Sequence, residues 1–286
     1  MKHLWRLTPA LLLFCSIAHA SHTVTDEAGR TIVVPDHPHR LIALAPSITD
    51  TLYAMGCGDD IVGVTDYTKY PPEATKKHSV GGVINPSLEE MVALKPDLIL
   101  AIGELNNYDL IHSIERLGLT IFVVHPQGIA GIYRSIESLG VAIHREEQAS
   151  ALIARLRTRE HAVRERVSGK GTPSVFFLLW TDPLMTAGRG AFVTELIAAA
   201  GGKSITDDLP NDWPRVSFET ILSRQPDYLL MMRGPQITAA SLQRQTTWQK
   251  LDAVRKGKFL YEDDRLEYPS PAAFDALEDL AKQLHP

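Results

Sequence analysis

The residues most able to do chemistry form no catalytic motif in this sequence. It contains no G-x-S-x-G nucleophile elbow, no H-E-x-x-H zinc motif and no P-loop. The glycines around Gly188 lack the third glycine and the later acidic residue of a dinucleotide site. We therefore expect a protein that is not an enzyme and that holds no resident cofactor.

Histidine and carboxylate side chains indicate a metal site only weakly. Beyond the first 20 residues, His37 and His39 stand close together on either side of a proline, which is typical of a solvated turn. A receptor for free zinc or manganese needs histidine and carboxylate ligands clustered in a cleft. His125 is the residue to follow under that less favoured alternative, and our prediction is that no metal site is present.

Aromatic residues in loops are stronger candidates, because such side chains stack on flat ligands. Tyr67 and Tyr70 lie in TDYTKYPP, where we expect Tyr70, next to two prolines, to pack within the turn. Trp213 precedes a proline, so it is either a loop anchor or a ligand contact. Trp180 ends an apolar run and faces either a core or a cleft. Trp248 falls on an apolar helix face and is predicted to be core.

Two glutamates hold equivalent positions in a phrase that the chain contains twice. SLEEMVALKPDLIL, which begins at Ser87, returns as SFETILSRQPDYLL, which begins at Ser217, and this indicates a duplicated unit. Each copy predicts a helix with a serine N-cap, a Pro-Asp turn and a buried strand, and Glu90 predicts a capping box in the first copy. Glu89 and Glu219 fall in the first helical turns, where a carboxylate complements the helix dipole.

The residues before the first copy predict a strand, a helix and a second strand. TVTDEAGRTIVVP reads as a hairpin, and the apolar run at 41–45 reads as a buried strand. Ser47 is the predicted N-cap of a helix at 48–55, with Gly56 just beyond its end. The next strand is predicted at 61–64. Two consecutive strands joined by a helix are expected to be parallel.

The second half repeats this order. SVFFLLW at 174–180 predicts one continuous strand, GAFVTELIAAAGG predicts a helix at 192–200 that two glycines close, and KSIT predicts a short strand. The duplication therefore extends over an α/β lobe, and the fold class predicted is α/β, with two Rossmann-like lobes that have parallel-rich central sheets.

A single long helix is predicted to join the lobes. The segment from Arg145 to Val167 contains no glycine or proline and would be about 35 Å long. One face carries apolar residues at helical spacing: Ala149, Leu152, Ile153, Leu156, Val163 and Val167. Two lobes bridged in this way leave a cleft between them, where small ligands bind. We expect little opening and closing, because a helix bends less readily than extended hinge strands.

The first 20 residues, MKHLWRLTPALLLFCSIAHA, read as a secretory signal peptide with cleavage after Ala20. Removing Lys2 and Arg6 with this leader lowers the formal net charge from −5 to −7, which makes nucleic acid an improbable partner. Only Cys57 then remains, so no intrachain disulfide is expected. The predicted divisions are 1–20 for the leader, 21–127 for the first lobe, 128–170 for a helical linker and 171–286 for the second lobe.

Together, these features resemble the extracytoplasmic substrate-binding proteins of ABC importers, in the helical-backbone class that serves cobalamin, ferric siderophores and haem. The motifs that carry the resemblance are LAPSITDTLYAMGCGDDIVGVTDYTKYPPEA, VGGVINPSLEEMVALKPDLILA, DWPRVSFETILSRQPDYLL and WQKLDAVRKGKFLY. The resemblance implies a monomeric periplasmic receptor that delivers a small-molecule metal chelate to a permease in the inner membrane. Within the class, the likeness is greatest to the cobalamin-binding members.

The resemblance also implies roles for individual residues. Tyr67 matches a tyrosine that lines the corrinoid pocket, and Trp213 matches a tryptophan that stacks on the ligand. Asp264, in YEDDRLEYPSP, matches an aspartate that accepts a hydrogen bond from the amide periphery of the ligand. Glu89 and Glu219 match glutamates at the tips of the lobes that meet arginine pockets on the permease.

The sequence departs from the cobalamin-binding pattern at several pocket positions. Val83 and Ile102 replace tryptophans, Met185 replaces a phenylalanine, and Tyr268 replaces an arginine. These changes remove stacking area for a flat macrocycle. We keep Met185 and Tyr268, with Trp180, among the predicted ligand contacts.

Other ligands and other classes of protein stay open at this point. Anionic siderophores need converging arginines, for which Arg189 and Arg215 are candidates. Haem needs an axial tyrosine or histidine, for which Tyr67, Tyr268 or His125 would serve. A secreted hydrolase is disfavoured because no nucleophile motif is present, and a structural module is disfavoured because the duplication creates a cleft. Cobalamin is the first choice.

Overall fold

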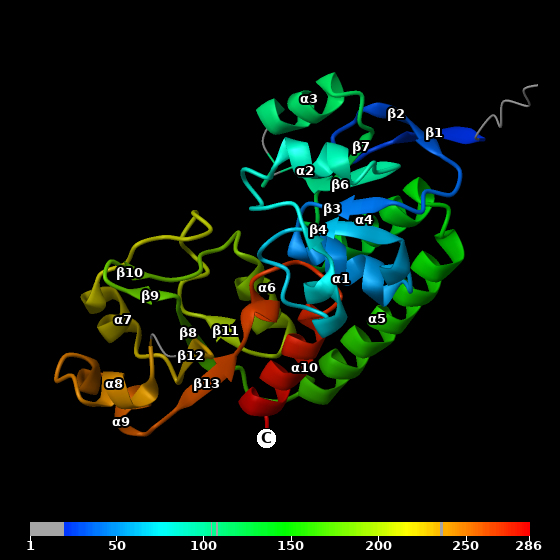
Figure 1. Cartoon of the computed structure of the whole chain (residues 1–286). Coiled ribbons are helices and arrows are strands. Elements are labelled where there is room, and N and C mark those ends of the chain that lie inside the picture. Colours follow the sequence, from blue (N-terminus) through cyan, green and yellow to red (C-terminus); the bar gives the residue numbers. More distant parts are fainter. Residues whose placement is uncertain (1–19, 104, 107, 235–236) are drawn as a thin grey trace, which may run out of the picture.

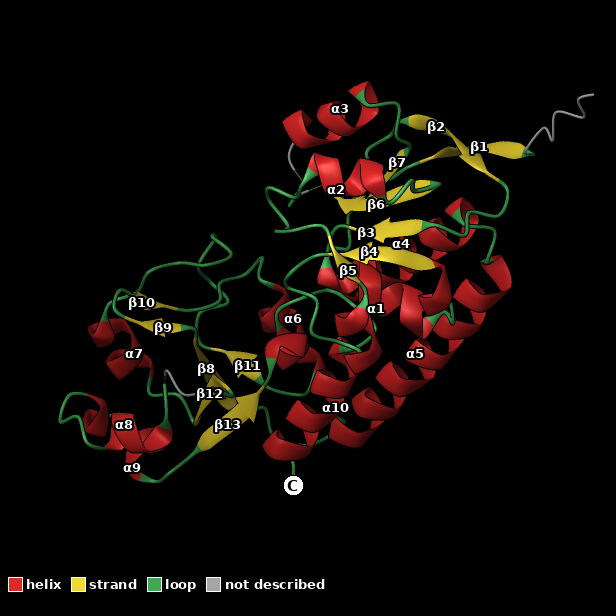
Figure 2. Cartoon of the chain, viewed as in Figure 1, coloured by secondary structure: helices red, strands yellow, loops and turns green. Residues whose placement is uncertain are grey.

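The structure is a computed structural model that describes residues 20–103, 105–106, 108–234 and 237–286. Apart from Ala20, the predicted signal peptide lies outside these residues. Figures 1 and 2 show two lobes, each with a strand layer covered by helices, and a long helix that runs beside both. Within the described ranges, no helix has the length and apolar character needed to cross a membrane.

The first lobe is built on a five-stranded sheet in which every pairing is parallel, in the order β5-β4-β3-β6-β7. Its strands are β3 (Leu41–Ala43), β4 (Ile61–Val64), β5 (His78–Ser79), β6 (Leu98–Ile102) and β7 (Ile121–Val124). Its helices are α1 (Pro46–Ala54), α2 (Leu88–Ala93) and α3 (Tyr108–Arg116). The predicted hairpin is present as the antiparallel pair β1 (Ser21–Thr25) and β2 (Thr31–Pro35), and it lies beside this sheet.

The second lobe has a four-stranded parallel sheet in the order β11-β8-β12-β13. Its strands are β8 (Ser174–Leu178), β11 (Lys203–Ser204), β12 (Tyr228–Met232) and β13 (Phe259–Glu262), and a small hairpin joins β9 (Trp180–Thr181) to β10 (Leu184–Met185). Its helices are α6 (Phe192–Ala199), α7 (Phe218–Arg224), α8 (Ala239–Gln243), α9 (Asp252–Arg255) and α10 (Ala273–Leu284). Single 3-10 turns occur at Gly58–Asp60, Pro72–Lys76, Trp248–Lys250 and Asp264–Leu266.

The two lobes share one topology, which confirms the internal duplication. The orders β4-β3-β6-β7 and β11-β8-β12-β13 match strand for strand, and the repeated phrase supplies the central strands β6 and β12. In both copies the predicted serine caps the helix, since Ser87 and Ser217 each accept a hydrogen bond at 3.2 Å from the backbone amide three residues later. In both copies the residue directly before the proline has a positive φ: Lys95 in the first copy and Gln225 in the second.

Three local predictions were wrong in detail. Helix α1 begins at Pro46, with Ala45 at its cap, so Ser47 lies inside the first turn; proline suits this start because its fixed φ is already helical. The side chain of Glu90 contacts His78 at 2.7 Å and does not complete a capping box. The predicted strand 174–180 ends at Leu178, and Trp180 begins the separate hairpin.

The bridging helix is α5 (Glu146–Val167), and it contacts both lobes. Its predicted apolar face packs into the core, with Ile153 and Val167 partly buried. On the first lobe Arg155 donates to the backbone oxygen of Ala54, and on the second lobe Arg159 donates to Glu278 of α10 at 2.6 Å. Helix α4 (Gly128–Ala142) precedes it and packs along it.

One hydrophobic core continues behind both lobes. Leu52 of α1, Phe177 of β8 and Leu277 of α10 belong to the same cluster of buried residues, which also includes the buried face of α5. Separating the lobes would expose this apolar surface to water, which is unfavourable. The prediction of an α/β fold with two lobes and a bridging helix is therefore confirmed, and the continuous core supports the expectation of restricted lobe motion.

Candidate functional site

The candidate site is a groove where loops from both lobes meet, and it consists of two adjoining hollows. The first hollow lies between the lobes and is lined by Pro46, Ser47, Asp50, Tyr67, Lys69, Tyr70, Asp264, Arg265, Tyr268, Ser270 and Ala272. The second lies over the carboxyl ends of β8, β12 and β13, and its lining includes Leu178, Leu179, Trp180, Met232, Arg233, Asp263 and Glu267. Lys69 and Asp264 line both hollows.

An ion pair crosses the groove at the boundary between the two hollows. Lys69 of the first lobe and Asp264 of the second lie 3.0 Å apart, from Nζ to Oδ2. The hydrogen bond to Asp264 raises the pKa of Lys69. Because the lysine is exposed, the pair contributes less than about 1 kcal/mol to stability. A ligand that spans both hollows would therefore lose little free energy by displacing the contact between Lys69 and Asp264.

A second contact between the lobes closes the floor of the groove. Asp50 of α1 is buried and accepts a hydrogen bond at 2.8 Å from the backbone amide of Ala272, just before α10. Burial raises the pKa of this carboxyl group, and the amide of Ala272 opposes that shift. Because the contact joins α1 to the start of α10, the two lobes are held in register beneath the groove.

The wall formed by the second lobe is rich in acidic groups. Burial raises the pKa of Glu267, and burial together with the charges of Glu267 and Asp264 raises the pKa of the Tyr268 hydroxyl. Glu262, at the end of β13, lies behind this wall and lines neither hollow. It is 1% exposed, and burial followed by the charges of Asp279 and Asp263 raises its pKa to about 7. The carboxylates of Asp264 and Glu267, which line the groove, can accept hydrogen bonds from amide donors.

The structure brings together four of the six side chains predicted to contact ligand. Tyr67, Asp264 and Tyr268 line the first hollow, and Trp180, which is 43% exposed, lines the second. The other two side chains lie beside these hollows in the same lobe. Met185 pairs with Trp180 across the β9–β10 hairpin, and Trp213 lies in the adjoining loop with its ring centroid 6.4 Å from that of Phe177.

Two further aromatic predictions have clear outcomes. Tyr70 was expected to pack within its turn, but it is 47% exposed and lines the first hollow, so this expectation was wrong. Tyr70 and Tyr67 therefore both line this hollow. Trp248 is buried and packs edge-on against Phe218 at 5.3 Å, which confirms its assignment to the core.

The positions where the family pattern has tryptophan offer little stacking surface here. Ile102 is 6% exposed at the end of β6. Val83 is half-buried, and its backbone oxygen accepts a hydrogen bond from Asn106 at 2.8 Å. The aromatic side chains that line this groove therefore come mainly from the tyrosine loop of the first lobe and from the hairpin of the second.

Three of the residues proposed for other ligands, Arg189, Arg215 and His125, do not line the two hollows, whereas the tyrosines proposed for haem, Tyr67 and Tyr268, line the first. The guanidinium of Arg189 donates to the backbone oxygens of Asp207 and Asp208, and Arg215 forms a backbone bridge with Met185. His125 lines a different hollow of about 870 Å³ in the first lobe. Among the described residues, the arginines that line the groove are instead Arg265 and Arg233.

Several groove residues escaped the sequence analysis. Lys69, Arg233 and Met232 line the second hollow, and Asp50 lines the first. The run LLMMR could have indicated two of them, because ligands bind at the carboxyl ends of strands in open parallel sheets. The contact between Lys69 and Asp264 has no local signal, since 195 residues separate the two positions.

The two predicted docking glutamates lie outside the groove, one on each lobe. Glu89 and Glu219 are exposed in the first turns of α2 and α7. The pKa of Glu219 is lowered by its own backbone amide and by the hydroxyl of Ser217, which favours the charged form of this carboxyl group. Figure 1 shows α2 and α7 on the side of the molecule away from α5.

Comparison with known proteins agrees with this architecture. The family described as "Periplasmic binding protein" matches residues 41–266. An uncharacterized ABC transporter substrate-binding lipoprotein of Bacillus subtilis, YvrC, is 28% identical over 272 residues, 92% of this chain and 85% of that protein. The vitamin B12-binding protein of Pectobacterium carotovorum is 32% identical over 219 residues, 76% of this chain and 78% of that protein.

A solved structure shows the same fold. The periplasmic heme-binding protein RhuT of Roseiflexus, in its apo form, matches with a TM-score of 0.79 and 25% identity, and the match covers 86% of this chain and 97% of that one. The two lobes, the groove between them and the matched residues lead to one assignment. The chain belongs to the periplasmic binding protein family, whose members bind substrates for ABC importers.

Proposed function

We propose that this protein captures a corrinoid, cobalamin, in the groove between its lobes and delivers it to the permease of an ABC importer. The observation that carries the proposal is the groove itself, where exposed tyrosine and tryptophan side chains surround carboxylates that accept hydrogen bonds. Corrinoids carry amide groups around a flat ring. Aromatic faces suit the ring, and carboxylates suit the amide donors. The likeness to a vitamin B12-binding protein supports the same choice.

The charge of the groove favours cobalamin over its anionic rivals. Haem carries propionates and many siderophores carry catecholates or carboxylates, which need cationic partners. In the groove, Lys69 is paired with Asp264, and Arg265 is paired with Asp263. Arg233, which lines the second hollow, also interacts electrostatically with Asp263. Glu267 adds a further acid. The haem alternative retains one specific observation, since Tyr268 faces the first hollow where an axial ligand could stand.

The size of the groove indicates how a bulky chelate would bind. The second hollow has a volume of about 420 Å³, at the lower end of the range for small-molecule sites, and the first has only about 30 Å³. A corrinoid therefore binds across both hollows, with the contact between Lys69 and Asp264 displaced and its outer face open to solvent.

The location and partner follow from the same assignment. We propose that the chain is exported by its first 20 residues, acts in the periplasm as a monomer and docks on the inner-membrane permease through Glu89 and Glu219. These carboxylates are exposed on separate lobes, and pairs with arginine would set the orientation of the receptor on the permease.

Visible absorption titration tests the choice of ligand directly. Mature protein is titrated with cyanocobalamin, hemin and a ferric catecholate under the same conditions. We expect cyanocobalamin to bind in the nanomolar to micromolar range, about −8 to −12 kcal/mol, and to bind more tightly than either rival. Tighter binding of hemin or of the ferric catecholate would overturn the proposal while leaving the family assignment intact.

A further inference from the structure

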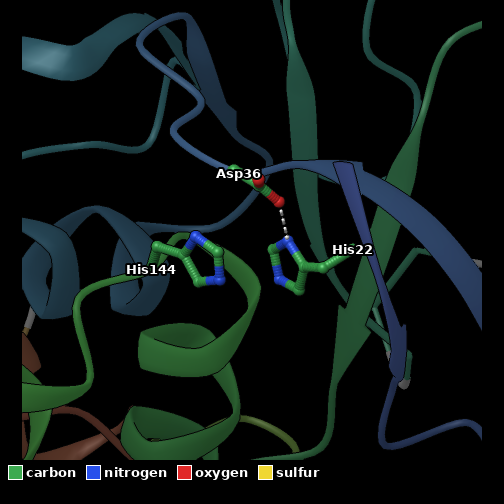
Figure 3. A group of neighbouring side chains, drawn as sticks. All are labelled: His22, Asp36 and His144. Atoms are coloured by element: carbon green, nitrogen blue, oxygen red, sulfur yellow. Dashed lines mark hydrogen bonds and ion pairs between the residues drawn. The ribbon is translucent and has the colours of Figure 1, made fainter. Parts of the chain in front are cut away.

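Away from the ligand groove, a cluster of three polar side chains joins segments that lie far apart in the sequence. His22 belongs to β1, Asp36 follows β2, and His144 lies in the turn between α4 and α5. One ligand atom from each lies within 4.8 Å of the others, and among the described residues this is the one such group of histidines and carboxylates. Figure 3 shows the three side chains turned toward one another.

The hydrogen bonds of His22 indicate which ring nitrogen could bind a metal ion. Its Nε2 atom lies 3.1 Å from the backbone oxygen of Val141, and a carbonyl oxygen can only accept, so Nε2 carries a hydrogen. Its Nδ1 atom faces Oδ1 of Asp36 at 3.1 Å. If both ring nitrogens carry hydrogens, the ring donates to Asp36 as an ion pair. If the ring is neutral, two lone pairs meet at this contact, and a metal ion between the two atoms would bind both.

This arrangement matches the way proteins hold metal-binding histidines. A ligand histidine typically donates its second ring nitrogen to a backbone carbonyl or a carboxylate, which sets the tautomer and the ring orientation. Two ligands about 2.1 Å from one ion and 3.1 Å apart subtend an angle of about 95° at that ion. The geometry of His22 and Asp36 is therefore compatible with a shared metal ion.

His144 is placed to supply a third ligand. Its ring stacks on that of His22 with centroids 4.0 Å apart and an angle of 9° between the ring planes. In a tetrahedral zinc site two ligand atoms lie about 3.4 Å apart, so ligand atoms up to 4.8 Å apart must approach by up to about 1.4 Å. The stacked rings must also tilt apart so that their lone pairs converge on one ion, a rotation that the broad χ2 range of histidine allows. His144 also has a φ of +51°, a conformation that is costly for residues other than glycine, asparagine and aspartate.

We propose that His22, Asp36 and His144 form a site for Zn²⁺ that fastens the β1–β2 hairpin to the turn between the two long helices. Imidazole and carboxylate are ligands that zinc accepts in tetrahedral sites. His37, whose ring centroid lies 5.3 Å from that of His144, or a water molecule completes the coordination. The site is independent of the ligand groove, so it is separate from the transport function proposed above.

The test uses the mature protein without a polyhistidine tag and Zn²⁺ alone as the probe. Calorimetric titration is expected to show one equivalent of Zn²⁺ per chain, and Co²⁺ is expected to give the visible absorption of a bound ion. Asp36→Asn and His144→Asn should each weaken zinc binding by at least about tenfold. Asparagine is chosen at position 144 because it tolerates the left-handed backbone.

A matched control is available on α3. His112 also contacts a carboxylate, Glu115, at 3.1 Å, but among the described residues these two belong to no group of three potential metal ligands, so His112→Asn should leave zinc affinity unchanged. Two results would overturn the site: absence of stoichiometric Zn²⁺ binding by the wild-type protein, or equal affinity in wild type, Asp36→Asn and His144→Asn. The first of these needs no variant, so the proposal can fail even if a substitution prevents folding.

Discussion

Glu262→Gln should stabilise the protein at alkaline pH and lose this advantage in acid. Glu262 is almost fully buried at the end of β13, where Gln283 donates a hydrogen bond to it at 2.7 Å. Its pKa in the folded protein is about 7, against an ordinary value of 4.5. The folded chain thus holds this proton more tightly than the unfolded chain does, and stability falls as pH rises from 4.5 through 7.

The magnitude follows from the size of the shift. A difference of about 2.5 pKa units corresponds to about 3 kcal/mol of stability, lost by the wild type between pH 4.5 and pH 8. Glutamine stays neutral and keeps the shape of the side chain. We therefore expect the difference in unfolding free energy between Glu262→Gln and wild type to grow by about 3 kcal/mol over this range.

Urea denaturation at several pH values between 4 and 8.5 measures this difference. Glu165→Gln, at an exposed position on α5, serves as the control for removing one acidic charge. The reasoning is refuted if the unfolding free energies of Glu262→Gln and wild type run parallel over the whole pH range.

Three further predictions concern binding and delivery. Exchanging both Glu89 and Glu219 for lysine should abolish uptake of the ligand in cells while its affinity for the purified protein stays unchanged; persistent uptake would refute docking through these residues. Lys69→Ala should change the unfolding free energy by less than about 1 kcal/mol and tighten ligand binding by up to about fivefold, because it removes a contact with Asp264 that closes the free groove; a tenfold loss of affinity would instead mean that the lysine contacts ligand. Trp180→Ala should weaken binding by roughly tenfold with little change in thermal stability, as absorption titration and thermal melting would show, and unchanged affinity would place the ligand away from the β9–β10 hairpin.

Much of the fold could be predicted because its signals are local. Helix caps and apolar spacing depend on residues within about one turn of each other, so Ser87, Ser217 and the face of α5 could be identified directly. The repeated phrase then linked the two lobes. The errors were also local: Pro46 moved a helix start by two residues, and an apolar run at Trp180 concealed a break between two strands.

The sequence by itself determined the two α/β lobes, the bridging helix and the absence of a recognisable catalytic motif. Periodicity and helix capping depend on neighbouring residues, and a repeat is found by comparing short segments, so none of these signals requires the tertiary structure. Only the tertiary structure decided which side chains meet. Lys69 reaches Asp264 across the groove, and His144 meets His22 beside the hairpin, although long stretches of chain separate each pair. Such contacts depend on how whole helices and strands pack against one another. The residues of the core come from many segments of the chain, so the packing cannot be inferred from any one of them.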